Sequence, residues 1–163
     1  MGRKIAVVFG GVSNENEISV ITGTMAVNVL KSGGDEVIPL YISQSGEFYT
    51  GAELADINIF KGGNFKRCPR AFVADGGIYA LNKRGKPKKF FSADVAVNCC
   101  HGGMGEGGGV CGLFALNGIP LASAGMFESA AFMDKYYTKL ILSSLGVKTA
   151  PYVYMRDLSG ISQ

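Results

Sequence analysis

The chain has 163 residues, of which 47% are apolar, so it can bury one sizeable core, and we expect one domain with a piece of another. Its sixteen basic and thirteen acidic residues leave a net charge of +3, too weak and too dispersed for a nucleic-acid or membrane surface. Because no apolar run is long enough to span a membrane and the four cysteines lack metal-ligand spacing, we expect a soluble, cytoplasmic protein with reduced thiols.

The first forty residues alternate as in a parallel α/β sheet. Lys4–Phe9 and Val37–Ile42 are short, continuous apolar runs, and each predicts a buried strand. Between them, Asn14 and Glu17 have the spacing of a capping box and predict the start of a helix. Apolar residues then recur at helical spacing, as in an amphipathic helix: Ile18, Ile21, Met25 and Val29. This order predicts a doubly wound sheet with helices on both faces.

The stretch 43–92 breaks this alternation with repeated turn signals. Asp75-Gly76 lies between the strand-like runs Ala71–Ala74 and Ile78–Leu81, and an Asp-Gly pair in that setting predicts a β-hairpin. The basic run Lys83–Lys89 could grip phosphate, but charge runs of this kind are commonly solvated loops. We therefore interpret 43–92 as a β-hairpin insertion without chemistry of its own, which covers a sheet edge or meets a partner chain.

The glycine-rich stretch Asn98–Gly112, NCCHGGMGEGGGVCG, is the centre of the predicted site. It follows the apolar run Ala93–Cys99, which predicts a buried strand, and leads into Val110–Asn117, which predicts a helix. It holds the only histidine of the chain, His101. Glycines let backbone N–H groups approach a ligand closely, and a helix N-terminus behind them favours negative charge. A small anion would fit in this loop.

The remainder of the chain predicts a short strand and a helical region. The strand is expected over Ile119–Ala122, and the helical region over Phe127–Leu145, where Gly146 ends it. Tyr152–Gln163 then begins with a strand-like pattern that is typical of the start of a new unit.

Three ionisable residues could carry chemistry at the carboxyl ends of the strands, where ligands bind in open α/β sheets. His101 and Glu106 belong to the glycine loop, and Glu15 follows the first strand. If those strands are neighbours, a positive His101 with backbone N–H groups would take the carboxylate of an amino acid, and Glu15 its ammonium. Glu106 could fix the tautomer of the histidine. Two plainer interpretations stay open: a structural histidine, and a Glu15 that only favours the first turn of a helix.

A dinucleotide site is a competing interpretation. Gly103–Gly108 formally satisfies the GxGxxG fingerprint, and Glu128 lies twenty residues downstream of it. In a dinucleotide fold, however, the fingerprint follows the first strand and the acid ends the second. Here the fingerprint follows a late strand, and Glu128 lies in a predicted helix, so the match is weak. No catalytic triad and no zinc-type ligand set is evident.

Four motifs in order resemble the amino-terminal third to half of a D-alanine–D-alanine ligase. They are FGGVSNENEIS at Phe9–Ser19, HGGMGEGGG at His101–Gly109, GIPLASAG at Gly118–Gly125 and MDKYYTK at Met133–Lys139. The resemblance implies a Rossmann-like pre-ATP-grasp domain over 1–124, carrying the insertion at 43–92. It also implies that 125–163 holds the first helices of an ATP-grasp central domain. We expect a homodimer.

The resemblance further implies a reaction and roles for single residues. Such ligases use ATP and Mg²⁺ to phosphorylate the carboxylate of one D-alanine, and a second D-alanine attacks the acyl phosphate to give a dipeptide for peptidoglycan. Glu15 matches the acid that orients the first ammonium, and we assign it as catalytic and substrate-binding. His101 matches the group near the carboxylate of that D-alanine, and we expect Glu106 to complete the substrate site. Lys135 matches a lysine that reaches the ATP phosphates, and no residue is assigned to a metal.

Two departures from the family loop leave the second substrate open. Gly107 stands in place of an aspartate and Cys111 in place of a glutamine, so a relative that accepts D-lactate or D-serine is an alternative. Because most of the ATP site has no position in this sequence, we expect a piece of a ligase that is inactive alone. A non-catalytic binding or dimerisation module of the same fold is the other alternative.

Overall fold

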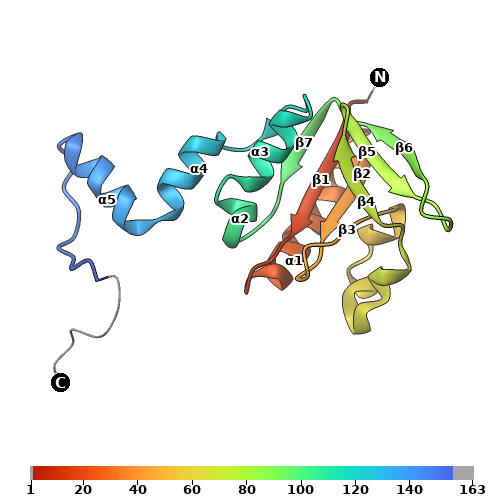
Figure 1. The fold of residues 1–163 in the computed structure, drawn as a ribbon, viewed down its shortest axis with the longest axis horizontal. Helices are drawn as coiled ribbons and strands as arrows, with labels where there is room; N and C mark the ends of the chain where they lie inside the picture. The colour runs from red at the N-terminus through yellow and green to blue at the C-terminus, as the bar shows by residue number, and fades with distance from the viewer. Residues whose placement is uncertain (1, 156–163) are drawn as a thin grey trace.

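The computed structural model describes residues 2–155, and its centre is a five-stranded sheet (Figure 1). The strand order is β3-β2-β1-β7-β8, in which β1, β2, β7 and β8 run parallel and β3 is antiparallel to β2. The bounds are β1 Lys4–Gly10, β2 Glu36–Ile42, β3 Phe48–Thr50, β7 Val95–Asn98 and β8 Leu121–Ala122. The predicted strands at 4–9, 37–42, 93–99 and 119–122 are confirmed, and so is the α/β class.

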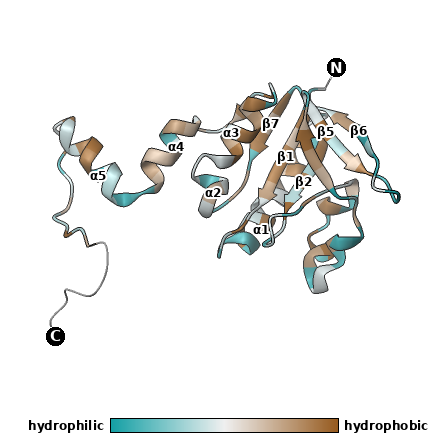
Figure 2. Cartoon of the chain, viewed as in Figure 1, coloured by the Kyte–Doolittle hydropathy of each residue, from teal (hydrophilic) through white to brown (hydrophobic). Residues whose placement is uncertain are grey.

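Helices cover both faces of this sheet, as predicted. Every residue of β1 and β2 after the first is buried, which explains why both strands are continuous apolar runs (Figure 2). On one face, Ile5, Val7 and Phe9 pack with α1 (Asn16–Ser32). On the other face, Ala6 and Val8 pack with α3 (Gly109–Leu116). The helix predicted over 110–117 is therefore confirmed.

The apolar stripe of α1 faces away from the sheet. Its four members are 52–63% exposed: Ile18, Ile21, Met25 and Val29. The buried side of α1 carries small residues instead, and a β-carbon on Gly23 would lie 2.2 Å from the Phe9 ring. Because Gly23 lets the helix axis come so close to Phe9, the small side packs on the sheet and leaves the larger side chains in solvent.

The capping box predicted at Asn14 is wrong. The N-cap residue of α1 is Glu15, and no side chain caps the helix there. The preceding turn is held differently, since the Glu15 N–H donates to Ser13 Oγ over 3.0 Å and the Asn16 N–H to the Ser13 carbonyl over 3.2 Å. Ser13 therefore holds the N–H groups of Glu15 and Asn16 in a local turn, in place of the predicted capping box.

The insertion 43–92 is larger than a hairpin and covers more than an edge. Its first strand, β3, extends the main sheet, and the 3₁₀ segments η1 (Ala52–Ala55) and η2 (Ile57–Arg67) lie on the α1 face. Its second part is a separate antiparallel sheet on the α3 face: β4 (Ala71–Ala74), β5 (Gly77–Leu81) and β6 (Pro87–Ser92). The predicted Asp75-Gly76 turn is confirmed, with φ of 46° and 67° joining β4 to β5.

Two short helices follow β8 and extend away from the α/β body (Figure 1). They are α4 (Met126–Met133) and α5 (Lys135–Ser144), and together they confirm the helical region predicted over 127–145. The break between them is Asp134, whose carboxylate accepts from the Tyr136 and Tyr137 N–H groups over 2.7 and 3.2 Å. Asp134 thus ends one helix and caps the next.

The strand predicted from Tyr152 onward is not formed by 152–155, and 156–163 lie outside the described residues. Within 2–155, no helix combines the length and the apolar character that crossing a membrane requires.

Candidate functional site

The first strand and the glycine loop meet at the carboxyl edge of the sheet. β1 and β7 are parallel neighbours, so the chain leaves both strands at the same edge. The two turns are in contact there, because a β-carbon on Gly102 would lie 2.5 Å from Ser13 Oγ and 3.6 Å from the carboxyl carbon of Glu15. Gly102 also has φ of 67°, where L side chains are strained. The side chain of Glu15 therefore lies against Gly102, the residue after His101. This is what we expected if β1 and β7 were parallel neighbours.

Ser19 ties the two strand ends together from α1. Its side chain is fully buried, and its hydroxyl accepts from the Gly10 N–H over 2.6 Å and donates to the Cys99 carbonyl over 2.7 Å. One hydroxyl thereby satisfies a donor of β1 and an acceptor after β7. No pattern in the sequence assigns this role to Ser19, which lies one helical turn after Glu15.

Asn16 fixes the turn that carries Glu15. Its amide donates to the carbonyls of Gly11 and Ile42 over 2.7 and 3.2 Å, and its side-chain oxygen accepts from the Tyr41 hydroxyl over 3.1 Å. Burial raises the pKa of Tyr41 against the opposing effect of this hydrogen bond, so the phenol stays a neutral donor. The side chain of Glu15 itself is exposed.

The half-buried ring of His101 is held by Thr22 of α1. The distance from His101 Nε2 to Thr22 Oγ1 is 3.1 Å, and the same hydroxyl donates to the Ile18 carbonyl over 3.1 Å. Because a hydroxyl has a single hydrogen, Thr22 then accepts from Nε2–H, and Nδ1 is left for another partner. No sequence motif assigns Thr22 to the site, because its contact with His101 joins residues 79 positions apart.

Glu106 contacts the backbone of the loop. It ends the short helix α2 (Gly103–Glu106), and its Oε2 accepts from the Gly102 N–H over 2.7 Å. Glu106 also lines a cavity of about 380 Å³ beside α4, together with Glu128. The hydrogen-bond partner of the His101 ring is therefore Thr22, and the predicted role of Glu106 in fixing its tautomer is filled by Thr22.

Lys135 is not brought to Glu15 and His101. It is the exposed first residue of α5. Its neighbour Asp134 lines a cavity of about 390 Å³ together with Gly103 and Gly107, so the α4–α5 junction does reach the glycine loop.

The four cysteines of the chain are free and buried. Burial, and then the neighbouring Cys99, raise the pKa of Cys100 to about 12, so this thiol stays protonated and is a poor nucleophile. Cys111, one of the two departures in the loop, donates its S–H to the Ala124 carbonyl over 3.2 Å. Gly107 is the other departure. A β-carbon added there would lie 3.0 Å from the Gly103 carbonyl oxygen, which is a tight contact.

Two further arrangements bear on cofactors. Among residues 2–155, no three His, Cys, Asp or Glu side chains gather in a way that could hold a metal ion. The GxGxxG stretch follows β7 and not β1, and Glu128 lies in α4. This is not the arrangement of a dinucleotide fold.

The family described as "D-ala D-ala ligase N-terminus" matches residues 4–124 of the chain. Among curated proteins, a D-alanine--D-alanine ligase of Corynebacterium aurimucosum is 36% identical over 156 residues, which is 91% of this chain and 42% of that protein. One of Sulfurovum sp. is 32% identical over 152 residues, which is 93% of this chain and 43% of that protein. The chain thus spans less than half the length of these relatives.

Solved structures are similar over nearly the whole chain. The D-alanine-D-alanine ligase of Coxiella burnetii has a TM-score of 0.82 and 25% identity, covering 97% of this chain and 47% of that one. The Helicobacter pylori enzyme has a TM-score of 0.79 and 28% identity, covering 93% and 47%. The VanG D-Ala:D-Ser ligase of Enterococcus faecalis has a TM-score of 0.72 and 27% identity, covering 90% and 43%.

Proposed function

Because this chain belongs to the family of D-alanine–D-alanine ligase amino-terminal domains, we propose that it holds the first substrate of a ligase that joins two D-alanines at the expense of ATP. The carrying observation is the contact between the turn after β1 and the glycine loop after β7, which sets Glu15 beside the residue that follows His101. In the proposed reaction, one D-alanine carboxylate is phosphorylated, and the amine of the second displaces the phosphate. The dipeptide would serve peptidoglycan synthesis in the cytoplasm.

Glu15 is proposed to bind the ammonium of the first D-alanine and to orient that substrate for phosphorylation. Its carboxylate is exposed at the sheet edge, and within residues 2–155 it forms no ion pair. A free carboxylate on a turn held by Asn16 and Ser13 is ready for a cationic ligand. A hydrogen bond between charged groups stabilises a complex by about 1.5–3 kcal/mol.

His101 is proposed to bind the carboxylate of the same D-alanine. Thr22 accepts the Nε2 hydrogen, so the group that remains for the substrate is Nδ1, which donates when the ring is protonated. Glu106 is proposed to complete this substrate site, because one of its oxygens holds the Gly102 N–H and thereby the loop between the two charged residues.

Lys135 is proposed to contact the ATP phosphates. Its place at the start of α5, beyond the α/β body, supports a role in the neighbouring nucleotide site and not at the D-alanine. The boundary near 124 is likewise a proposal, in which 125–163 begin the central ATP-grasp domain. It is supported by the end of the family match at 124 and by exposed apolar side chains, which are Phe127 and Phe132 on α4 and Leu145 directly after α5.

A homodimer is proposed through the stripe of α1. The stripe of Ile18, Ile21, Met25 and Val29 is long, exposed and on the outside of one helix. A two-fold contact places the same patch of each copy against the other, which lets one apolar stripe cover itself.

A D-Ala:D-Ser ligase is a second candidate, favoured by the likeness to the Enterococcus faecalis enzyme. Both candidates require the same first substrate, so Glu15 and His101 keep their roles. They are separated by offering D-serine and D-alanine in competition and identifying the dipeptide formed.

The test is ATP-dependent phosphate release with D-alanine by a full-length ligase that carries this chain, either from its own reading frame or joined to the remainder of the Corynebacterium aurimucosum relative. Glu15→Gln and His101→Ala should each lower kcat/KM for the first D-alanine by about 1–3 kcal/mol in transition-state stabilisation. Glu36→Gln, at the opposite end of the sheet, is the matched control and should leave the kinetics unchanged. Unchanged kinetics in the first two variants would remove both residues from the site.

A further inference from the structure

A further cavity lies outside the site just discussed. It has a volume of about 640 Å³ and opens between α1, the end of β2 and η2. Neither Glu15, His101 nor Glu106 lines it. A volume of this size is within the range of small-molecule sites, which are commonly largely formed before the ligand binds.

Three aromatic rings line the inner part of this cavity. Tyr41 meets Phe60 and Phe65 edge to face, with ring centroids 4.8 and 4.9 Å apart, and the two phenylalanines lie nearly parallel at 6.1 Å and 26°. Both phenylalanines come from η2 because the chain reverses between them at Gly62 and Gly63, which have φ of 65° and 74°. Tyr41 is buried, whereas the rings of Phe60 and Phe65 are only half-buried and leave an apolar surface toward the cavity.

Two lysines and one glutamate stand around these rings. Lys61 and Lys66 come from η2, and Glu17 comes from α1. The ammonium of Lys61 donates to the neutral amide of Asn58 over 2.8 Å, so its charge is not cancelled, and within 2–155 no ion pair involves any of the three. The cavity therefore carries an excess of one positive charge beside an aromatic wall.

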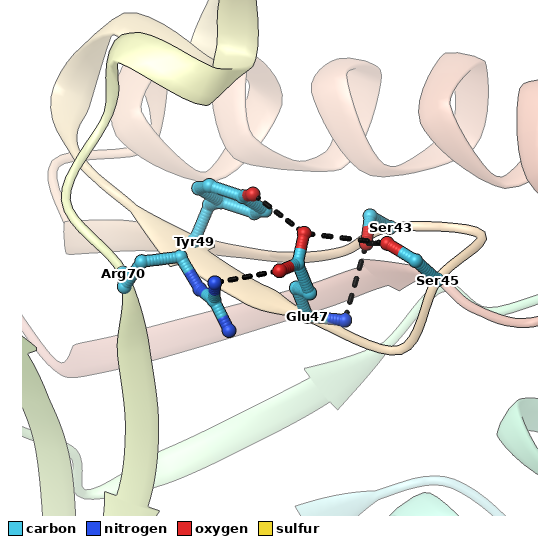
Figure 3. Close-up of polar contacts among 5 residues, drawn as sticks. All are labelled: Ser43, Ser45, Glu47, Tyr49 and Arg70. Atoms are coloured by element: carbon cyan, nitrogen blue, oxygen red, sulfur yellow. Dashed lines mark hydrogen bonds and ion pairs between the residues drawn. The ribbon is translucent and has the colours of Figure 1, made fainter.

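A hydrogen-bond network holds the polar side of the cavity. Ser43 and Ser45 line it from the β2–β3 turn, and Figure 3 shows the network that fixes them. The Ser43 and Ser45 hydroxyls are 2.9 Å apart, and Glu47 accepts from Ser45, from Tyr49 over 2.8 Å and from Arg70 over 2.6 Å. Because Arg70 neutralises Glu47, this acid does not offset the charge of the cavity lysines.

We propose that this cavity binds a small ligand with a flat aromatic ring and one anionic group. The ring would lie on Phe60 and Phe65, and the anion would be held by Lys61 and Lys66. A cationic ligand is disfavoured because two lysines and only one glutamate line the cavity, and a purely apolar ligand would gain nothing from the lysines.

The test uses this chain and two probes that share one ring system, indole-3-acetate and the neutral indole-3-acetamide. Titration followed by amide chemical shifts should give saturable changes at Tyr41, Gly62, Gly63 and Phe65, with the acetate binding about two- to fivefold more tightly, the range for a solvent-exposed ion pair. Lys66→Gln should remove most of that preference. Lys88→Gln, the same change on the separate sheet, should not alter it.

A second variant separates the ring contact from the charge. Phe60→Leu keeps an apolar side chain but removes a flat surface, and it should weaken both probes by a similar factor. Three results would each overturn the proposal: equal affinity for the two probes, shifts confined to α4 and α5 or to Met25 and Val29, or an equal effect of Lys66→Gln and Lys88→Gln.

Discussion

Thr22 supports the imidazole of His101 from the middle of α1, with Oγ1 3.1 Å from Nε2. The same hydroxyl donates to the Ile18 carbonyl, so its remaining capacity toward the ring is as an acceptor. The helix that packs on β1 thus also sets which nitrogen of His101 carries the hydrogen toward Thr22. The tautomer of a proposed substrate-binding group depends on a side chain that does not itself belong to the predicted site.

Thr22→Val should weaken first-substrate use in a full-length ligase that carries this chain. Valine keeps the shape of threonine but leaves Nε2–H without its acceptor, at a cost of about 1 kcal/mol, or about fivefold in kcat/KM for the first D-alanine. Thr22→Ser restores the hydroxyl and should return most of the loss. Steady-state kinetics at varied D-alanine concentration, with the pH profile of kcat/KM, measure both. If the serine and valine variants behaved alike, Thr22 would serve packing alone.

Lys135→Ala should chiefly raise the KM for ATP. The lysine is placed beyond the α/β body, and the loss of a cation near the phosphates removes charge stabilisation there. Lys148→Ala removes an exposed lysine from the same region and is the control. Kinetics at varied ATP, with D-alanine saturating, give the answer; a change in D-alanine dependence alone would show that Lys135 is misplaced.

Glu47→Gln should make the chain less stable at neutral pH, and the difference should shrink in acid. The hydrogen bond from Tyr49 and the charge of Arg70 lower the pKa of Glu47 from its ordinary value of 4.5 in the folded chain. A lowered folded pKa means that this stabilisation is present above about pH 4.5 and is lost as the pH falls through the folded pKa. The melting temperature from pH 3 to 7 is the measurement. Tyr49→Phe removes the leading donor and should reduce the effect; a gap between wild type and Glu47→Gln that stayed constant with pH would contradict it.

Met25→Lys should convert the proposed dimer to a monomer. In the proposed dimer, the new lysine would be buried in the interface. The two-fold axis would place it near the same lysine of the second copy, and the two ammonium groups would repel each other. Phe90→Lys, on an exposed position of β6, is the matched control. Mass by light scattering across a concentration series measures the state. A wild-type chain that is monomeric throughout the series, or a dimer that survives Met25→Lys, would rule out this surface.

Much of the architecture was predictable because its signals are local or periodic. The continuous apolar runs of β1 and β2 indicate strands buried on both faces, and the Asp75-Gly76 pair indicates a hairpin through the backbone conformation it favours. Even the nearness of Glu15 and His101 followed from one assumption, that their strands are parallel neighbours. The resemblance of four motifs to a ligase family pointed the same way as the family match.

Other features were decided by packing between distant segments. The sequence of α1 has one large apolar side and one small-residue side, and only the close approach of Gly23 to Phe9 decides which side is buried. Thr22 reaches His101 across 79 positions, and the cavity wall joins Tyr41 of β2 to η2 of the insertion. Composition and spacing thus determined the strands, the turns and the edge of the sheet that carries the charged residues. Tertiary contacts alone decided the buried face of α1, the support of His101 and the cavity lined by Tyr41, Phe60 and Phe65. These contacts join segments far apart in the sequence, and no local pattern specifies them.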